Sequence, residues 1–256
     1  MGRHRILILG GTTEARQLAD RLKGRVDCDV LLSLAGRTAE PMAQPVPVRS
    51  GGFGGAEGLA HFLRSNNFDL LIDATHPFAA RISANAAIAA RQTGIAAFAL
   101  RRPAWERQAC DRWTSVSTMA DAVRALGMTS RNVFLAIGRQ EAFQFEQAPQ
   151  HHYLVRSVDP VTPQLKLPQA RYILAAGPFD RADERRLLED NHIDVIVAKN
   201  SGGSAIYGKI AAARDLGIEV VMVERQEAAD LQSVGTLADA LDRIDHLLSP
   251  EMKRGV

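Results

Sequence analysis

Short, almost continuously apolar runs alternate along this sequence with segments of helical periodicity. Such runs are typical of strands buried on both faces, because a strand covered on one face alternates apolar and polar residues. The runs are Arg5–Leu9, Val30–Leu34, Leu70–Ala74, Ala96–Leu100, Asn132–Ile137, His152–Arg156, Tyr172–Ala176, Asp194–Lys199 and Glu219–Val223. The predicted helices are Thr13–Leu22, Ala56–Arg64, Ala79–Arg91 and a closing helix at Thr236–Leu248. This order predicts an α/β fold with mainly parallel sheets and helices on both faces.

Two features favour a division into two domains. So many strands would make one large sheet, and the charged, irregular stretch Arg101–Trp113 interrupts the alternation. The strand, glycine turn and helix of ILILGGTTEARQLADRL are also weakly echoed by YILAAGPFDRADERRLL. We therefore predict two Rossmann-like domains, residues 1–115 and 116–256, with an active-site cleft between them. The boundary is expected within residues 101–131, and a strand of one half could complete the sheet of the other.

Composition excludes several classes of protein. The 256 residues have a formal net charge of +2 and 46% hydrophobic residues, so the core is sizeable and nucleic-acid binding is not indicated. Cys28 and Cys110 match no metal or redox spacing, and no metal site is expected. The N-terminal apolar run is too short for a signal peptide, and Ala84–Leu100 is too short to span a bilayer. We expect a soluble, cytoplasmic protein without membrane association; a monomer is the working assumption.

The first predicted strand runs into a glycine-rich turn, Gly10–Ala15, which resembles the dinucleotide-binding fingerprint. Thr12 stands where the second glycine is usual, and Ala15 stands where the third is. Gly10 permits the tight turn, and the following helix presents unpaired N–H groups to a pyrophosphate. The alternative is a plain strand-to-helix turn in which Thr12 or Thr13 caps the helix without any ligand.

The end of the second strand indicates which nucleotide would bind. In NAD-specific sites this strand ends in an acidic residue that binds the ribose 2′-hydroxyl, whereas here it ends in Ser33-Leu34-Ala35-Gly36-Arg37. A hydroxyl and a guanidinium suit a 2′-phosphate, because arginine forms bidentate bonds with phosphate. The sequence therefore favours NADPH over NADH. The alternative for Arg37 is a solvated charge on a loop.

Two further turns of the first half could approach the same ligand. Gly52 lies among the four glycines of Gly51–Gly55, which permit close backbone approach but equally suit a flexible loop. Thr75 and His76 follow the next strand, at the edge where open α/β sheets bind ligands. They could contact the cofactor ribose or nicotinamide, or they could belong to the cap of the next helix.

Basic and hydroxyl side chains follow the strands of the second half. Each basic residue taken singly is more often a surface charge, but successive strand ends meet at one sheet edge. Such an edge suits an anionic, polycarboxylate substrate. The segments are Gly138–Gln140, Arg156–Asp159, Gly177–Asp180 and Lys199–Gly203.

Four motifs in fixed order carry a resemblance to a known family. GGTTEAR (Gly10–Arg16), DATHPFA (Asp73–Ala79), GPF (Gly177–Phe179) and KNSGG (Lys199–Gly203) resemble the precorrin-6A reductase family, over the span from Ile6 to about Glu227. The resemblance implies two Rossmann-like domains and a pyridine-nucleotide reduction of precorrin-6A to precorrin-6B in cobalamin synthesis. The hydride would come from NADPH, and the substrate would be a tetrapyrrole polycarboxylate.

The predicted site follows from these turns and from the resemblance. Predicted cofactor-binding residues are Gly10, Gly11, Thr12, Thr13, Glu14, Ala15, Arg16, Ser33, Ala35, Gly36, Arg37, Gly52, Thr75 and His76. Predicted substrate-binding residues are Arg139, Arg156, Ser157, Gly177, Pro178, Phe179, Lys199, Ser201 and Gly202. The candidate proton donors are Lys199, His76 and Asp180, each supported by position alone.

Three rival interpretations stay open at this point. The first is the cobalt-precorrin-6A reductase of the cobalt-early route, for which NADH could serve. The second is a non-catalytic module that senses NADP(H), although a sensor needs no polycarboxylate site. The third is a short-chain-type reductase, which would need a lysine four residues after a tyrosine. Four residues after Tyr153, Tyr172 and Tyr207 the sequence has Ser157, Ala176 and Ala211 instead.

Overall fold

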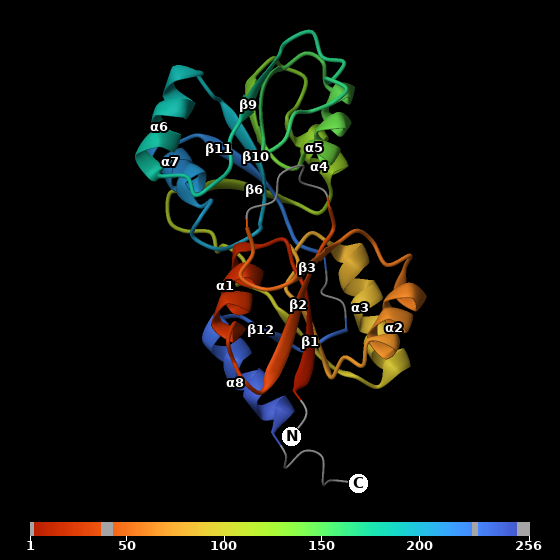
Figure 1. Ribbon diagram of the computed structural model, residues 1–256. Helices are drawn as coiled ribbons and strands as arrows, with labels where there is room; N and C mark the ends of the chain where they lie inside the picture. Colours follow the sequence, from red (N-terminus) through yellow and green to blue (C-terminus); the bar gives the residue numbers. More distant parts are fainter. Residues whose placement is uncertain (1–2, 37–42, 227–229, 250–256) are drawn as a thin grey trace. The chain divides into compact units, whose positions relative to one another are not determined.

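The computed structural model describes residues 3–36, 43–226 and 230–249 and divides the chain into two compact units (Figure 1). Unit 1 comprises Met1–Pro103 together with Glu227–Val256, and unit 2 comprises Ala104–Gln226. Each unit is built on one six-stranded sheet whose paired strands are all parallel. None of the described helices is both long and apolar enough to cross a membrane.

The sheet of unit 1 has the strand order β12-β5-β4-β1-β2-β3. Its two central strands, β1 and β4, are mostly apolar, as predicted, because both faces are covered by helices. Ile6 and Ile8 pack in a cluster with residues of α1 and α8, while Leu7 and Leu9 pack with residues of α2 and α3. The elements are β1 (His4–Leu9), α1 (Thr13–Leu22), β2 (Cys28–Leu34), β3 (Val48–Ser50), α2 (Ala56–Ser65), β4 (Leu70–Asp73), α3 (Ala80–Thr93), β5 (Ala96–Leu100), β12 (Ser233–Val234) and α8 (Leu237–Leu248).

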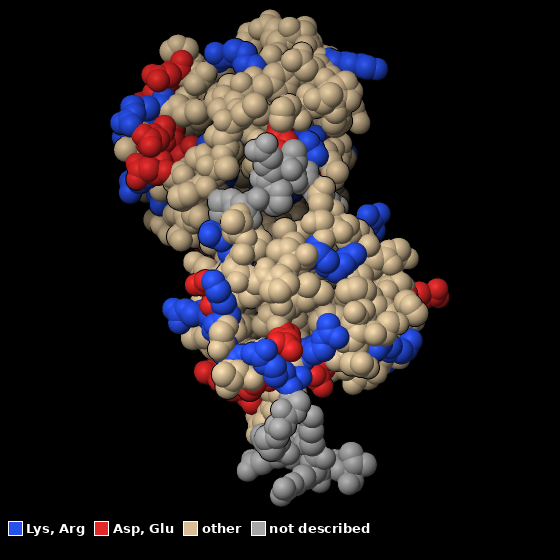
Figure 2. Space-filling view, viewed as in Figure 1, with Lys and Arg blue, Asp and Glu red and all other residues tan. Residues whose placement is uncertain are grey.

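The sheet of unit 2 has the strand order β6-β11-β10-β7-β8-β9. Trp113, Phe134, Ile196 and Met222 belong to one buried cluster on this sheet. Basic and acidic side chains gather together over α6 on the face drawn in Figure 2. The elements are β6 (Arg112–Val116), α4 (Met119–Ala125), β7 (Asn132–Ala136), α5 (Arg139–Ala142), the 3₁₀ helix η1 (Phe143–Gln147), β8 (His152–Ser157), β9 (Ala170–Leu174), α6 (Arg181–Asp190), β10 (Val195–Lys199), α7 (Gly208–Leu216) and β11 (Glu219–Val223).

The two sheets have the same spatial order of strands. In each sheet five strands are consecutive in the chain, β1 to β5 in unit 1 and β7 to β11 in unit 2, and the sixth strand lies outside that run. Strand β6 follows β5 in the chain but pairs with β11 of unit 2, with Arg112 opposite Glu219. Strand β12 follows β11 but pairs with β5 of unit 1, with Ser233 opposite Ala99. The described part of the chain thus exchanges one strand in each direction.

The observed division differs from the predicted domains 1–115 and 116–256. The chain enters unit 2 at Ala104, and β6, which begins within the stretch that the sequence presented as irregular, belongs to unit 2. The C-terminal segment leaves unit 2 again, because α8 packs against α1. Completion of one sheet by a distant strand, which the sequence left open, is therefore present in both units. The active-site cleft expected between the domains stays a prediction.

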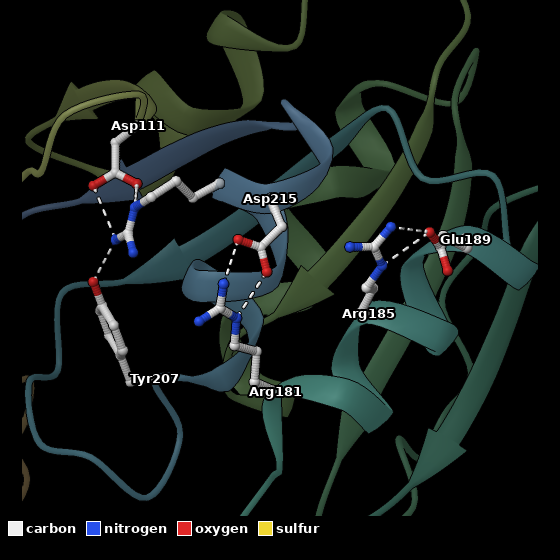
Figure 3. Close-up of polar contacts among 7 residues, drawn as sticks. Asp111, Arg181, Arg185, Glu189, Tyr207 and Asp215 are labelled. Carbon is white, nitrogen blue, oxygen red and sulfur yellow. Dashed lines mark hydrogen bonds and ion pairs between the residues drawn. The ribbon is translucent and has the colours of Figure 1, made fainter.

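Unit 2 anchors the segment that enters it from unit 1 through Asp111. This buried carboxylate accepts hydrogen bonds from Arg214 of α7 at 2.8 and 3.3 Å (Figure 3). Arg214 also donates to the Tyr207 hydroxyl at 2.5 Å, and Asp111 raises the pKa of its guanidinium. In the same region Arg181 of α6 forms two bonds of 2.7 and 2.5 Å to Asp215 of α7. Side-chain pairs thus tie the incoming segment and α6 to α7.

Candidate functional site

Each sheet has one position where the strand order reverses. In unit 1 it lies between β1 and β4, and in unit 2 it lies between β7 and β10. Crossover connections leave such a position in opposite directions, so the carboxyl ends of the two strands open a crevice where ligands of α/β proteins bind. The predicted turns at Gly10 and Thr75 flank the first reversal, and those at Gly138 and Lys199 flank the second.

The Gly10 turn of unit 1 is tight on its inner side and open on its outer side. A Cβ at Gly10 would lie 2.6 Å from Cδ1 of Leu32, so only glycine fits there without displacing a buried side chain. Gly11 has a φ of +111°, and a Cβ on it would meet nothing within 4 Å. The backbone at Gly11 is therefore accessible to a ligand, in a conformation that favours glycine.

Thr12 serves the protein itself. It is the N-cap of α1, where its Oγ1 accepts a hydrogen bond from the Ala15 N–H at 3.1 Å. The same hydroxyl donates to the Ala74 carbonyl oxygen at 2.8 Å, so it joins the turns after β1 and β4 across the reversal. Its side chain thus takes the capping role that the sequence left open. Of its neighbours in α1, Thr13 and Arg16 are exposed and Ala15 is buried against the sheet.

Two arginines directly after β5 support this edge, although the sequence indicated only a charged stretch there. Arg102 contacts Glu14 in the first turn of α1 at 2.6 Å. Arg101 contacts Asp73 at 2.9 Å, and the Asp73 side chain is only 1% exposed. Asp73 also accepts hydrogen bonds from the backbone N–H of Thr75 at 3.1 Å and from its hydroxyl at 2.6 Å. An ion pair with little solvent exposure therefore orients the Thr75 turn.

His76 is held by the backbone of its own turn. Its Nδ1 accepts a hydrogen bond from the Phe78 N–H at 3.2 Å, and the two rings lie 5.8 Å apart. When the ring is neutral, this bond leaves the proton on Nε2. His76 thus lies next to Thr75 at the edge of the sheet, as the sequence predicts, with one nitrogen used by the fold.

An arginine that the sequence did not single out lies beside the end of β2. Ser33 is buried, and its hydroxyl oxygen accepts a hydrogen bond at 2.8 Å from Arg49 of β3. Burial lowers the pKa of the Arg49 guanidinium. Ala35, Gly36 and Gly52 are exposed on the loops beside this pair. Arg37, the predicted phosphate ligand, lies outside the described residues. Arg49 could have been found only by pairing β3 with β2, and the three-residue β3 gave too weak a signal.

The reversal in unit 2 is occupied by a side-chain ion pair. Lys199 Nζ lies 2.7 Å from Glu141 Oε1, and the lysine side chain is 14% exposed. A Cβ at Gly138 would lie 2.4 Å from Glu141 Oε2, so the glycine leaves room for this carboxylate. Arg139 Nη1 lies 3.9 Å from Asp159 Oδ2 and is half-exposed. Lys199 and Arg139 therefore meet at one edge, as the sequence predicts, with carboxylate partners that it did not predict.

The loop after β10 braces the segment that carries Trp105. Asn200 accepts a bond from the Trp105 backbone N–H at 2.7 Å and donates to its carbonyl oxygen at 3.0 Å. The Trp105 indole donates to the Gly203 carbonyl oxygen at 2.7 Å. Ser201 and Gly202 are buried in the same loop. Part of the KNSGG motif thus maintains the fold of unit 2.

Arg156, a predicted substrate ligand, is buried and paired. It donates to the Glu184 carboxylate at 2.5 and 2.9 Å, and its guanidinium carbon lies 3.8 Å from the centre of the Phe179 ring. Ser157 donates to the Asp159 carbonyl oxygen at 2.7 Å. These contacts fix the ring of Phe179 and use the charge of Arg156 inside the unit.

The remaining predicted residues lie on the loop before α6. Gly177 and Pro178 are joined by a cis peptide bond and are exposed. The Phe179 N–H donates to the Ala205 carbonyl oxygen at 2.9 Å. Asp180, a candidate proton donor, is the N-cap of α6, where it accepts a hydrogen bond from the Ala182 N–H at 2.7 Å. The capping bond gives Asp180 a structural role at the start of α6.

A strand order of the 3-2-1-4-5-6 kind in both units, with polar groups at both reversals, defines a protein of two Rossmann-like units. The model of the family described as precorrin-6x reductase CbiJ/CobK matches residues 5–245. The chain belongs to this family. Its resemblance to these reductases, predicted from four motifs, is therefore confirmed, as is the prediction of an oxidoreductase of cobalamin biosynthesis.

Similar proteins match over nearly the full length. The chain is 65% identical over 250 residues to the precorrin-6A reductase of Sinorhizobium sp, which covers 98% of this chain and 96% of that protein. It is 46% identical over 253 residues to the precorrin-6A reductase of Rhodobacter capsulatus, at 98% and 99% coverage. The solved structure of CobK precorrin-6A reductase is 45% identical, with a TM-score of 0.91 over 99% of this chain and 100% of that one. The similarity thus extends through both units.

Proposed function

We propose that this protein reduces precorrin-6A to precorrin-6B in cobalamin biosynthesis, with NADPH as the reductant. The observation that carries this proposal is the match of nearly the whole chain to a reductase family. The open glycine turn at the reversal of unit 1 supports a nicotinamide dinucleotide as the source of reducing equivalents. Both relatives described above are precorrin-6A reductases. Their names favour the metal-free substrate over its cobalt-containing counterpart.

Unit 1 is the part of the chain that fits the dinucleotide. Gly10 and Gly11 allow backbone approach, and the ten-residue α1 directs the N–H groups of its first turn toward a pyrophosphate. The charge of Glu14 in that turn is compensated by Arg102, which lessens its repulsion of a bound phosphate. Ser33 is positioned for the adenosine end, and Thr75 and His76 for the ribose and nicotinamide. The bound cofactor would supply hydride, and the protein supplies orientation and charge.

Unit 2 is the part of the chain that fits the acidic macrocycle. Lys199 and Arg139 present cationic groups at its reversal, where the substrate carboxylates can pair with them. Glu141 Oε1, at 2.7 Å, holds the Lys199 ammonium in place. Hydride addition to a conjugated system must be followed by a proton at a neighbouring atom. We assign that proton to Lys199 Nζ, because Asp180 is engaged as a helix cap.

The decisive experiment is an assay of NADPH consumption with authentic precorrin-6A, with NADH run in parallel. We expect NADPH to be oxidised with formation of precorrin-6B, and NADH to be used far less efficiently. Cobalt-precorrin-6A as a second substrate tests the cobalt route. If neither cofactor is consumed while NADPH still binds, the chain acts as a sensor and the proposed reduction is wrong.

A further inference from the structure

We infer that Arg49, positioned by Ser33, recognises the 2′-phosphate of NADPH. This inference rests on the proposed function, because it names the group that selects NADPH within the proposed cofactor site. It assigns the selectivity to a residue of β3 that lies sixteen positions beyond Ser33 in the chain. Arg37, which the sequence predicts for the same phosphate, lies outside the described residues.

Strand pairing brings the two side chains together. In the parallel register of β2 and β3, Ser33 lies directly opposite Arg49. Arg49 Nη1 donates to Ser33 Oγ at 2.8 Å and to the Gly51 carbonyl oxygen at 3.0 Å, while Nη2 donates to the Gly52 carbonyl oxygen at 3.1 Å. The guanidinium carbon lies 3.9 Å from the centre of the Phe53 ring. Arg49 is therefore held in one orientation before any ligand arrives.

The charge of this guanidinium has no carboxylate partner in the described part of the chain. No Asp or Glu oxygen of residues 3–36, 43–226 and 230–249 lies within 4.0 Å of its nitrogens. By contrast, Arg101 and Arg102 at the same sheet edge each contact a carboxylate. A partly buried cation bonded only to neutral oxygens attracts an anion, because its charge is incompletely compensated.

The donor geometry leaves room for that anion. A guanidinium has five N–H groups, and the three bonds to Ser33, Gly51 and Gly52 use both groups of Nη1 and one of Nη2. One N–H of Nη2 and the N–H of Nε are left over by these bonds. Two such donors can bind two oxygens of one phosphate.

The position identifies which phosphate would bind. In Rossmann folds the end of the second strand lies beside the 2′ position of the adenosine ribose. Ser33 is the penultimate residue of β2, and no acidic residue occurs between Ser33 and Gly36 that could bind a free 2′-hydroxyl instead. The pyrophosphate is expected one strand away, at the Gly10 turn. A cation at the Ser33 end is therefore suited to the phosphate that distinguishes NADPH from NADH.

A structural role for Arg49 makes a different prediction. If the residue only braces the Gly51–Gly55 loop, its loss would weaken the binding of both nucleotides equally. The ratio of the dissociation constants for NAD⁺ and NADP⁺ would then stay unchanged. This ratio is therefore the readout that separates recognition from bracing.

The test is calorimetric titration of the full chain with NADP⁺, NAD⁺, 2′,5′-ADP and 5′-AMP. For Arg49→Met we expect the preference for NADP⁺ over NAD⁺ to fall roughly tenfold or more, because a charge-assisted hydrogen bond is lost. Ser33→Ala should reduce the preference less, and Arg49→Lys should keep part of it. Arg21→Met, which removes an exposed arginine from the last turn of α1, is the matched control and should leave all four affinities unchanged.

The outcomes separate this inference from the proposed function. If the wild-type protein binds no NADP⁺, the proposed cofactor is wrong. If the wild-type protein prefers NADP⁺ and Arg49→Met and Arg49→Lys both keep the full preference, Arg49 does not recognise the 2′-phosphate. Should Arg49→Met fail to fold, Arg49→Lys and Ser33→Ala decide the question by the same ratio.

Discussion

The first strand-to-helix turns of the two units occupy the same place in the same topology, yet they are built for different chemistry. In unit 1 the chain passes through Gly10 and Gly11 into α1, a helix of ten residues. In unit 2 it passes through Gly138 into α5, which has only four. A longer helix offers a better-formed positive terminus, so the backbone N–H groups of the first turn suit an anion better than those of the second turn do.

What fills each turn reinforces the difference. At Gly11 the space that a side chain would occupy is open. At Gly138 the corresponding space holds the Glu141 carboxylate, which in turn holds Lys199. The same fold thus presents backbone donors in one unit and a side-chain cation in the other. A shared topology specifies where a site lies, and the local residues specify what it binds.

The largest expected effect concerns the ion pair that stiffens unit 2. Glu184→Gln removes the carboxylate while leaving Arg156 buried beside Lys209, so we expect a loss of about 3–5 kcal/mol in the free energy of unfolding. Glu189→Gln on the same helix is the control. It breaks only the half-exposed contact with Arg185 (Figure 3), and the expected loss is below about 1 kcal/mol. Urea denaturation measures the free energy of unfolding of both variants. Equal losses would show that the buried pair of Arg156 and Glu184 stabilises the protein no more than the half-exposed pair does.

A second prediction separates the chemistry of the two turns. Lys199→Met should lower kcat on the order of 100-fold, because the assigned proton donor is lost. The dissociation constant for NADP⁺ should not change, because that ligand is assigned to unit 1. Lys166→Met removes an exposed lysine from unit 2 and should leave kcat as it is. Stopped-flow kinetics and calorimetry provide the two readouts; a parallel loss of cofactor affinity would break the distinction between the units.

Thr12 tests whether the turn of unit 1 depends on its double hydrogen bond. Thr12→Ala should destabilise the protein by about 1–2 kcal/mol through loss of the N-cap and should also weaken NADP⁺ binding. Thr236→Ala removes the N-cap of α8 in the same unit, with a similar cost in stability and no change in NADP⁺ binding. Thermal unfolding measures the stability of the two variants, and calorimetric titration measures their affinity for NADP⁺. Unchanged NADP⁺ affinity in Thr12→Ala would mean that the tie to Ala74 does not shape the site.

The prediction with the smallest effect per step is a dependence on pH confined to unit 2, where each pH unit changes the stability only slightly. The second residue of α3 is the exposed Arg81, whereas the second residue of α7 is the buried Lys209. The pKa of Lys209 is lowered to about 7, chiefly by burial; Arg156 also lowers it, and Glu184 raises it. Between pH 7 and the ordinary lysine value, the unfolded chain holds a proton that the folded one has lost. The free energy of unfolding should therefore rise with pH in this window, by about 1 kcal/mol per unit.

Lys209→Met provides the control for that dependence. Without the titrating group, this contribution to the slope between pH 7 and 9.5 should disappear. Urea denaturation at several pH values measures the difference between wild type and variant. Parallel profiles for the two proteins would show that Lys209 keeps its ordinary pKa in the folded protein.

The sequence predicted the central strands because continuous apolar runs are a strong local signal. It missed β3, β6 and β12, which have at most five residues, lie at sheet edges and are defined by distant pairing partners. The site residues were likewise predicted where the signal is local and missed where it depends on distant partners. The turns at Gly10, Thr75 and Lys199 follow directly from strand ends, whereas the contacts of Arg49 and Arg101 depend on pairing and packing across the sheet. Arg156 differs again: its position at a strand end predicted a substrate contact, which stays a prediction, and its ion pair with Glu184 of α6 was not predicted.

The reciprocal exchange of sixth strands has a consequence for synthesis on the ribosome. Unit 1 starts first, but its sheet lacks β12, and its α1 face lacks Ala240 and Ile244 of α8, until residues after 230 have emerged. Unit 2 can pair all six of its strands as soon as β11 is available. The unit that is translated first is therefore completed last. The nascent chain carries an unfinished unit 1 through most of its elongation, and in that interval the uncovered edge of β5 is exposed to mispairing and to chaperones.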